Sequence, residues 1–140
     1  MKVVIVGAGP AGLISALYLI REGESPLVLE KRPAIRSKVC GEACSLESLG
    51  KIPFDSSDYI RRQLKGAQIV YADGSSSYMN KRCVTLDRTG WLEGMAREVQ
   101  VKGCHIRFDS EVVAVEVFWQ WCWYQFSLEV DDDPNLWALQ

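Results

Sequence analysis

Apolar residues near the start of the chain form two short uninterrupted runs, residues 3–6 and 26–29, separated by a segment with helical spacing. Uninterrupted runs of this length are typical of strands buried on both faces of a parallel sheet. The segment between them places its large apolar residues on one face, which predicts a helix over about residues 10–22 that stops at Gly23. In this order the three elements predict one βαβ unit of an α/β fold.

The pattern changes after Gly66, where alternating residues surround an Asp-Gly pair at Asp73 and Gly74. We expect a β-hairpin there, because Asp-Gly favours the tight turns that join two antiparallel strands. A helix is expected at residues 87–102, and its apolar face carries Trp91, Leu92, Met95 and Val99. Short helical segments are expected at residues 45–50 and 56–64, and further strands at residues 83–86, 104–108 and 112–118.

Three glycines follow the first apolar run with the spacing Gly7-x-Gly9-x-x-Gly12. In dinucleotide-binding folds the first glycine makes a tight turn, the second lets the backbone approach a pyrophosphate, and the third lets the helix pack closely on the strand. Glu30 ends the second apolar run, at the distance expected for a carboxylate that binds a ribose. Although a glycine-rich turn of another α/β fold remains the alternative, the ordering favours a dinucleotide site.

Composition narrows the function classes. The 140 residues suit one domain, and a net charge of −2 gives no general electrostatic reason to bind nucleic acid. The five cysteines include no CxxC pair, so we expect neither a disulfide framework nor a metal site. No signal peptide or long apolar segment is evident, and we expect a cytoplasmic setting. The single histidine, His105, has no neighbouring partner in the sequence that would favour a general base.

Five stretches of the chain form recognisable motifs. Residues 4–12 (Val-Ile-Val-Gly-Ala-Gly-Pro-Ala-Gly) and 29–32 (Leu-Glu-Lys-Arg) resemble the general motifs of FAD-dependent oxidoreductases. Residues 37–43 (Ser-Lys-Val-Cys-Gly-Glu-Ala), 65–69 (Lys-Gly-Ala-Gln-Ile) and 84–88 (Val-Thr-Leu-Asp-Arg) resemble segments of geranylgeranyl reductases, notably the archaeal digeranylgeranylglycerophospholipid reductases. The resemblance covers about residues 1–117.

The resemblance implies a Rossmann-like FAD-binding domain of three layers, with a parallel sheet and an added β-hairpin or meander, in an enzyme that reduces isoprenoid double bonds of prenyl lipids. It implies that Cys40 lies near the flavin, as a candidate proton donor for catalysis. Reduced flavin would supply hydride, and NAD(P)H or ferredoxin would be the external reductant. The cofactor-binding residues that we expect are Gly7, Gly9, Pro10, Ala11, Gly12, Glu30, Lys31, Cys40, Gly41, Ala43, Arg88 and Val112.

The chain also departs from the family pattern. Nothing after Val117 resembles the Gly-Asp motif that holds the flavin ribityl chain, and the substrate sheet has no counterpart. We therefore expect an FAD-binding domain over residues 1–117 that is incomplete at its C-terminus, followed by an atypical aromatic and acidic tail over residues 118–140. Trp119, Trp121 and Trp123 alternate within this tail and are expected on one strand face. The expected partners are a prenyl-lipid substrate, a missing C-terminal substrate domain and, through the lipid, a membrane surface.

Three other functions remain open. An FAD-dependent aromatic hydroxylase or halogenase-like monooxygenase would share the motifs up to Arg36, but the Cys-Gly-Glu segment argues against it. A plain NAD-binding module should continue with another βα unit, where this chain has the predicted hairpin after Gly66. A non-catalytic fragment that binds a nucleotide is the third alternative, and the missing ribityl motif favours it.

Overall fold

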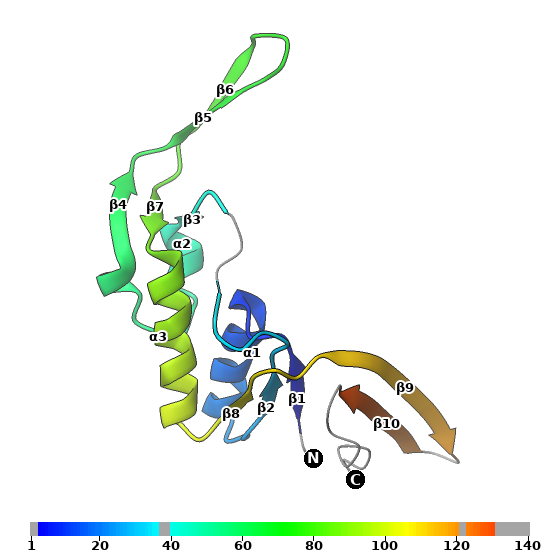
Figure 1. Ribbon diagram of the computed structural model, residues 1–140. Coiled ribbons are helices and arrows are strands. Elements are labelled where there is room, and N and C mark those ends of the chain that lie inside the picture. Colours follow the sequence, from blue (N-terminus) through cyan, green and yellow to red (C-terminus); the bar gives the residue numbers. More distant parts are fainter. Residues whose placement is uncertain (1–2, 37–39, 121–122, 131–140) are drawn as a thin grey trace.

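The βαβ unit predicted at the N-terminus is present in the computed structural model, which describes residues 3–36, 40–120 and 123–130 (Figure 1). Strand β1 (Val4–Val6) leads through the glycine turn into helix α1 (Pro10–Arg21), and the chain returns along β2 (Leu27–Leu29). Strand β8 (His105–Arg107) joins the other side of β2, so that the three strands form a parallel sheet with β2 at its centre. The α/β fold with a parallel sheet is confirmed.

The long helix α3 (Arg88–Val101) packs beside α1, and both helices contact the parallel sheet. Asp87 caps α3, because its side chain accepts a hydrogen bond from the Gly90 N–H at 3.2 Å. The apolar face predicted for this helix is confirmed, since all four of its predicted residues are buried. Together with apolar side chains of α1 and β2 they form the core; its most deeply buried members include Leu13, Leu17, Val28, Leu92, Met95 and Val99.

A second, antiparallel sheet lies next to α3 and has the order β3-β7-β4. Its strands are β3 (Ala43–Ser45), β4 (Ile60–Leu64) and the central β7 (Cys83–Leu86). Helix α2 (Leu46–Leu49) forms within the expected residues 45–50, and the Ser45 hydroxyl caps it by accepting a hydrogen bond from the Ser48 N–H. The prediction of helical turns over residues 56–64 is wrong for most of these residues. Only the short 3₁₀ helix η1 (Ser57–Tyr59) forms, and pairing with β7 draws the following residues into β4.

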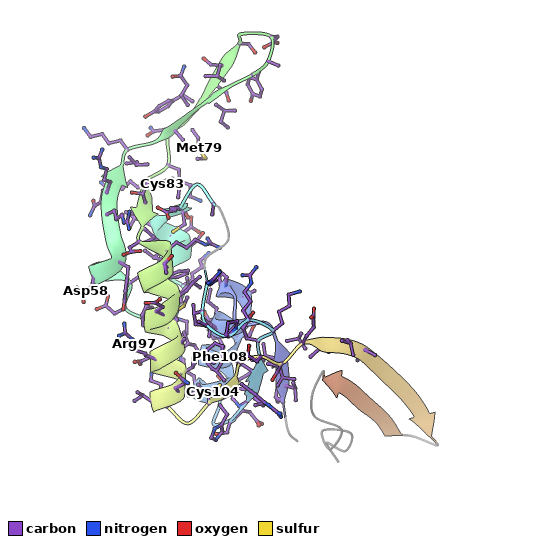
Figure 2. The ribbon with its side chains drawn as sticks, in the orientation of Figure 1. Asp58, Met79, Cys83, Arg97, Cys104 and Phe108 are labelled. Atoms are coloured by element: carbon purple, nitrogen blue, oxygen red, sulfur yellow. The ribbon has the colours of Figure 1, made fainter. Side chains whose placement is uncertain are left out.

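The expected β-hairpin is confirmed, and it extends away from both sheets (Figure 1). Strands β5 (Ala67–Val70) and β6 (Ser76–Met79) pair only with each other among the described residues. Figure 2 shows side chains standing out on both sides of this hairpin, above Met79 at its base. Apart from Ala67, all of its strand residues are exposed.

The aromatic segment forms two strands, where the sequence analysis expected one. Strand β9 (Val112–Gln120) continues through residue 117 and pairs antiparallel with β10 (Trp123–Val130), with Gln120 opposite Trp123. The expectation of three tryptophans along one strand is therefore wrong, because the chain reverses between residues 120 and 123. Trp121, Cys122 and the acidic residues 131–133 lie outside the described residues. Among the helices that the structure describes, none is long and apolar enough to cross a membrane.

Candidate dinucleotide site

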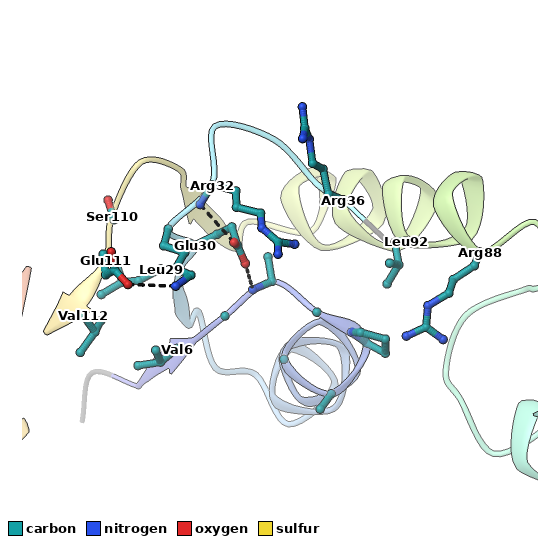
Figure 3. A pocket seen from close by; sticks show the side chains of 17 residues that line it. Val6, Leu29, Glu30, Arg32, Arg36, Arg88, Leu92, Ser110, Glu111 and Val112 are labelled. Carbon is teal, nitrogen blue, oxygen red and sulfur yellow. Dashed lines mark hydrogen bonds and ion pairs between the residues drawn. The ribbon is translucent and has the colours of Figure 1, made fainter. Parts of the chain in front are cut away.

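The glycine turn forms one wall of a cavity of about 640 Å³ at the end of the parallel sheet (Figure 3). Gly7 has a φ of +95°, a conformation that side chains rarely adopt. A Cβ on Gly12 would collide with the Gly7 carbonyl oxygen, whereas a Cβ on Gly9 would meet no atom within 4 Å. The third glycine thus allows close packing of helix and strand, and the second leaves open space in front of the turn. Both roles match the sequence prediction.

Helix α1 starts directly at this cavity. Gly9 is its N-cap, no side chain caps it, and Pro10 occupies the first turn. The first N–H groups of a helix have no partner within the helix, and the helix dipole adds positive potential at the same point. Pro10, Ala11 and Gly12 all line the cavity. The start of α1 is therefore suited to an anion such as a pyrophosphate.

Glu30 lies at the end of β2, where two backbone groups hold its carboxylate (Figure 3). Oε2 accepts from the Ala8 N–H at 2.8 Å, and Oε1 accepts from the Arg32 N–H at 3.1 Å. Each carboxylate oxygen has two lone pairs, so these hydrogen bonds leave acceptor capacity for a ligand hydroxyl. The carboxylate is thereby fixed in the cavity wall, which is the geometry that ribose binding requires.

Nine of the residues predicted to bind a cofactor lie in the wall of this cavity. Gly7, Gly9, Pro10, Ala11, Gly12, Glu30, Lys31, Arg88 and Val112 all line it. Lys31 also forms an exposed ion pair with Glu111 at 2.9 Å. Sequence reasoning missed Arg36, Leu92, Ser110 and Glu111 as lining residues. Ser110 and Glu111 follow β8, and only the pairing of β8 with β2 brings them beside Glu30.

Three of the predicted cofactor-binding residues belong to the segment that follows the first βαβ unit. Cys40, Gly41 and Ala43 do not line this cavity, so their predicted contact with the same cofactor pocket has no support from its lining. Ala43 instead lines a second cavity of about 200 Å³, which shares Pro10 and Arg88 with the first. Cys40 is exposed, and its Sγ accepts a hydrogen bond from Nη1 of Arg88 at 3.4 Å.

The other described cysteines and His105 lie outside the cavity at the glycine turn. Cys83, in β7, and Cys104, just before β8, are buried. Burial, and secondarily the neighbouring Cys83, raises the pKa of the Cys44 thiol. His105 is exposed at the start of β8 and lines neither of the two cavities. Within the described ranges, no three His, Cys, Asp or Glu side chains lie close enough together to hold a metal ion.

A buried donor shows that the main cavity fits a phosphate-containing group. Nε of Arg88 is buried and has no hydrogen-bond partner among the described residues, although Arg88 lies on the cavity wall. A buried donor without an acceptor is costly, and a phosphate oxygen is a preferred partner of guanidinium. The free helix start, the glycine cradle, Glu30 and Arg88 together provide what a dinucleotide cofactor such as FAD needs.

Comparison with known proteins supports this interpretation. Residues 1–48 match the family model described as an FAD binding domain. Over 74 residues the chain is 43% identical to the digeranylgeranylglycerophospholipid reductase of Methanococcus vannielii, a match that covers 51% of this chain and 18% of that protein. The matched segment thus spans about a fifth of the length of this relative.

Solved structures share the fold. A geranylgeranyl bacteriochlorophyll reductase-like protein from Thermoplasma acidophilum is 26% identical with a TM-score of 0.69, over 92% of this chain and 36% of that one. A flavin-dependent halogenase is 20% identical with a TM-score of 0.65, over 82% of this chain and 24% of that one, and shows likeness of fold alone. The chain therefore has the Rossmann-like FAD-binding fold of the FAD-dependent oxidoreductases.

Proposed function

We propose that this chain is the FAD-binding part of a flavin-dependent oxidoreductase that reduces isoprenoid double bonds of prenyl lipids. The observation that carries the FAD site is the cavity in which the start of α1, Glu30 and Arg88 face one space. The prenyl-lipid substrate rests on the 43% identity to the archaeal reductase and on the Cys-Gly-Glu segment at Cys40. The substrate and the activity belong to a protein several times longer than the matched segment.

Different residues of the cavity would bind different parts of the FAD molecule. The N–H groups at the start of α1 would bind the pyrophosphate, and Arg88 would add a cation beside it. Glu30 would accept hydrogen bonds from the adenosine ribose, since its carboxylate is already fixed by two backbone donors. Val112 lies on the opposite side of Glu30 from Arg88 in Figure 3, and its backbone would contact the adenine. Lys31 would lie at the edge of the cavity.

Reduced FAD supplies a hydride in this chemistry, and NAD(P)H or ferredoxin would restore the reduced state. Saturation of a carbon–carbon double bond also needs a proton on the carbon that does not take the hydride. The Cys40 thiol is our candidate for that proton. Cys40 would be left as a thiolate, and water would return the proton.

A monooxygenase of the hydroxylase or halogenase type is the second candidate, because its fold is shared over 82% of the chain. It would use the same FAD cavity but would have no need of a thiol at residue 40. Substitution of Cys40 by Ser therefore separates the two candidates. It would abolish proton transfer to an alkene and leave a hydroxylation or halogenation unchanged.

The first experiment measures FAD binding by the purified chain. We expect the flavin absorbance to remain with the protein after desalting, and Glu30→Gln to weaken FAD binding by about tenfold, the equivalent of one charge-assisted hydrogen bond. Glu22→Gln, at the exposed C-terminal end of α1, is the matched control and should bind as the wild type does. A protein that never retains FAD would contradict the proposal.

The second experiment tests the reaction. The FAD-loaded chain is reduced chemically without oxygen and mixed with a geranylgeranyl lipid in vesicles, and the lipid is analysed by mass spectrometry. Added hydrogen on the isoprenoid chain supports the reductase. FAD binding without any reduced lipid would support a nucleotide-binding fragment whose activity needs further polypeptide. Sedimentation of the same vesicles tests the membrane association that a lipid substrate implies.

A further inference from the structure

Arg88 occupies a junction between the two cavities. It is the first residue of α3, so the capped start of that helix fixes its backbone. Its side chain lines both the 640 Å³ cavity at the glycine turn and the 200 Å³ cavity beside Ala43. Figure 3 shows the guanidinium reaching from α3 toward the start of α1, on the other side of the turn from Glu30.

The guanidinium has donors for two acceptors. Nη1 donates to the Cys40 sulfur at 3.4 Å, across 48 positions of sequence. Nε is buried without a partner in the part of the chain that the structure describes. A guanidinium carries five N–H donors in a rigid plane, so a move of the group toward one acceptor changes its contact with the other.

We propose that Arg88 is a positioning residue that couples the dinucleotide cavity to the Cys40 thiol. Its guanidinium holds the Cys40 sulfur, and a bound phosphate of the dinucleotide competes for the same guanidinium. Occupancy of the cavity thereby sets how reactive Cys40 is. This inference rests on the proposed FAD site and deepens it, because it names the group through which the cofactor acts on Cys40.

The physical basis is the hydrogen bond from Nη1 of Arg88 to the Cys40 sulfur. A cysteine attacks a disulfide through its sulfur, so the group that holds this sulfur influences how fast it reacts. Arg88 is the described cation in hydrogen-bond contact with Cys40. When a diphosphate draws the guanidinium into the cavity, that support weakens. The coupling requires no movement of the backbone, since a change of side-chain direction at Arg88 is sufficient.

The Cys40 sulfur can be observed selectively. It is exposed, whereas Cys44 is half-buried and Cys83 and Cys104 are buried. Burial raises the pKa of the Cys104 thiol, which keeps that cysteine unreactive near neutral pH. Among the cysteines that the structure describes, Cys40 is therefore the one that an aromatic disulfide reagent labels first, and Cys122 lies outside them. The Cys40 thiolate forms a mixed disulfide, the reagent's sulfur–sulfur bond breaks, and an aromatic thiolate leaves. Peptide mapping by mass spectrometry assigns the label to residue 40.

The first arm of the test uses no nucleotide. We expect Arg88→Met to slow labelling of Cys40 about threefold, because the attacking sulfur loses the hydrogen-bonded cation beside it. Arg88→Lys should restore part of the rate, since it returns a cation without the planar donor set. Arg97→Met, an exposed arginine of the same helix, is the matched control and should label as the wild type does. Equal rates in Arg88→Met and the wild type would overturn the proposal, provided that circular dichroism shows both folded.

The second arm adds ADP, which carries a diphosphate but no flavin that could cover Cys40. Saturating ADP should slow wild-type labelling about threefold and leave Arg88→Met unchanged. If ADP slows both proteins equally, the effect is shielding and the coupling is wrong. If calorimetry shows that ADP binds the wild type without changing its labelling, the coupling fails while the dinucleotide site stands. If ADP and FAD both fail to bind, the coupling and the proposed site fail together.

Discussion

Helix α1 with its flanking strands and the β5–β6 hairpin are both short segments with clear hydrophobic patterns, yet they differ in where those apolar side chains lie. In the βαβ unit Leu13, Leu17 and Val28 are buried between α1, α3 and the sheet. In the hairpin the apolar side chains are exposed, and Val70 is 69% exposed against 0% for Val28. The same residue type thus has opposite surroundings in two strands of the same chain.

This difference shows that the hydrophobic pattern determines which secondary-structure element forms. Whether the apolar side chains of that element are buried depends on which other elements pack against it. In the βαβ unit the crossover helix packs on the sheet whose strands it connects, so the unit buries apolar side chains by itself. A two-stranded hairpin has no second layer and is marginal in water by itself.

Gly12→Ala should have the largest effect, because it places a Cβ against the Gly7 carbonyl where helix α1 packs closely on the glycine turn. The backbone cannot move away from the new Cβ as a flexible side chain could. We therefore expect a loss of about 3 kcal/mol or more in the free energy of unfolding. Urea unfolding followed by circular dichroism measures it.

Gly9→Ala is the matched control, because its Cβ meets nothing within 4 Å and its φ of −77° suits alanine. Its stability should change by less than about 0.5 kcal/mol, while its FAD affinity falls, since the new methyl group faces the cavity. Equal stability losses for the two variants would show that the packing role and the binding role of the glycines are not separate.

Val28→Ala and Val70→Ala make the same change in the two regions. The buried site should lose about 2 to 3 kcal/mol of unfolding free energy through lost transfer energy and a cavity, and the exposed site less than about 0.5 kcal/mol. Urea unfolding of both variants gives the comparison directly. A large loss at Val70 would mean that the hairpin is covered in solution, for instance by a second copy of the chain, and sedimentation analysis would then detect the dimer.

Ser56→Ala tests a polar contact that the buried region depends on. The Trp91 Nε1–H donates to the Ser56 hydroxyl at 2.8 Å, and both residues are buried. Loss of the acceptor should cost about 1 to 2 kcal/mol, because a buried N–H is left unsatisfied. In a Trp91→Phe background, which has no such donor, the same substitution should cost less in urea unfolding. An equal cost in both backgrounds would assign the effect to packing.

Much of the dinucleotide site could be predicted because its signals are local. Gly7, Gly9, Gly12 and the first turn of α1 act through backbone conformation, which depends on neighbours in sequence. Glu30 could be placed because the length of one βαβ unit determines its distance from the glycines. The start of α3 could be placed from Asp87, whose side chain caps it.

The parts that sequence reasoning missed depend on long-range pairing. Residues 60–64 include Arg61, Arg62 and Gln63, which show no strand alternation, and they become β4 only through pairing with β7. Ser110 and Glu111 reach the cavity because β8 joins β2 across the sheet. The contact of Cys40 with Arg88 likewise joins a loop to a helix start 48 positions later. No local pattern carries such information.

Raising the pH should produce the smallest change, and it again distinguishes a buried site from an exposed one. Cys104 is 3% exposed and its Sγ donates to the Pro26 carbonyl oxygen at 3.2 Å. Burial raises the pKa of this thiol, so the folded protein keeps a proton that the unfolded chain releases. The unfolded state then binds fewer protons, and the free energy of unfolding decreases as the pH rises above the ordinary thiol range, about 8.5. Below that range this group contributes no pH dependence. Urea unfolding at about pH 7 and about pH 10 should show a smaller alkaline loss in Cys104→Ala than in the wild type. An alkaline loss that is unchanged in Cys104→Ala would mean that other groups, such as the half-buried Cys44 with its raised pKa, carry the dependence.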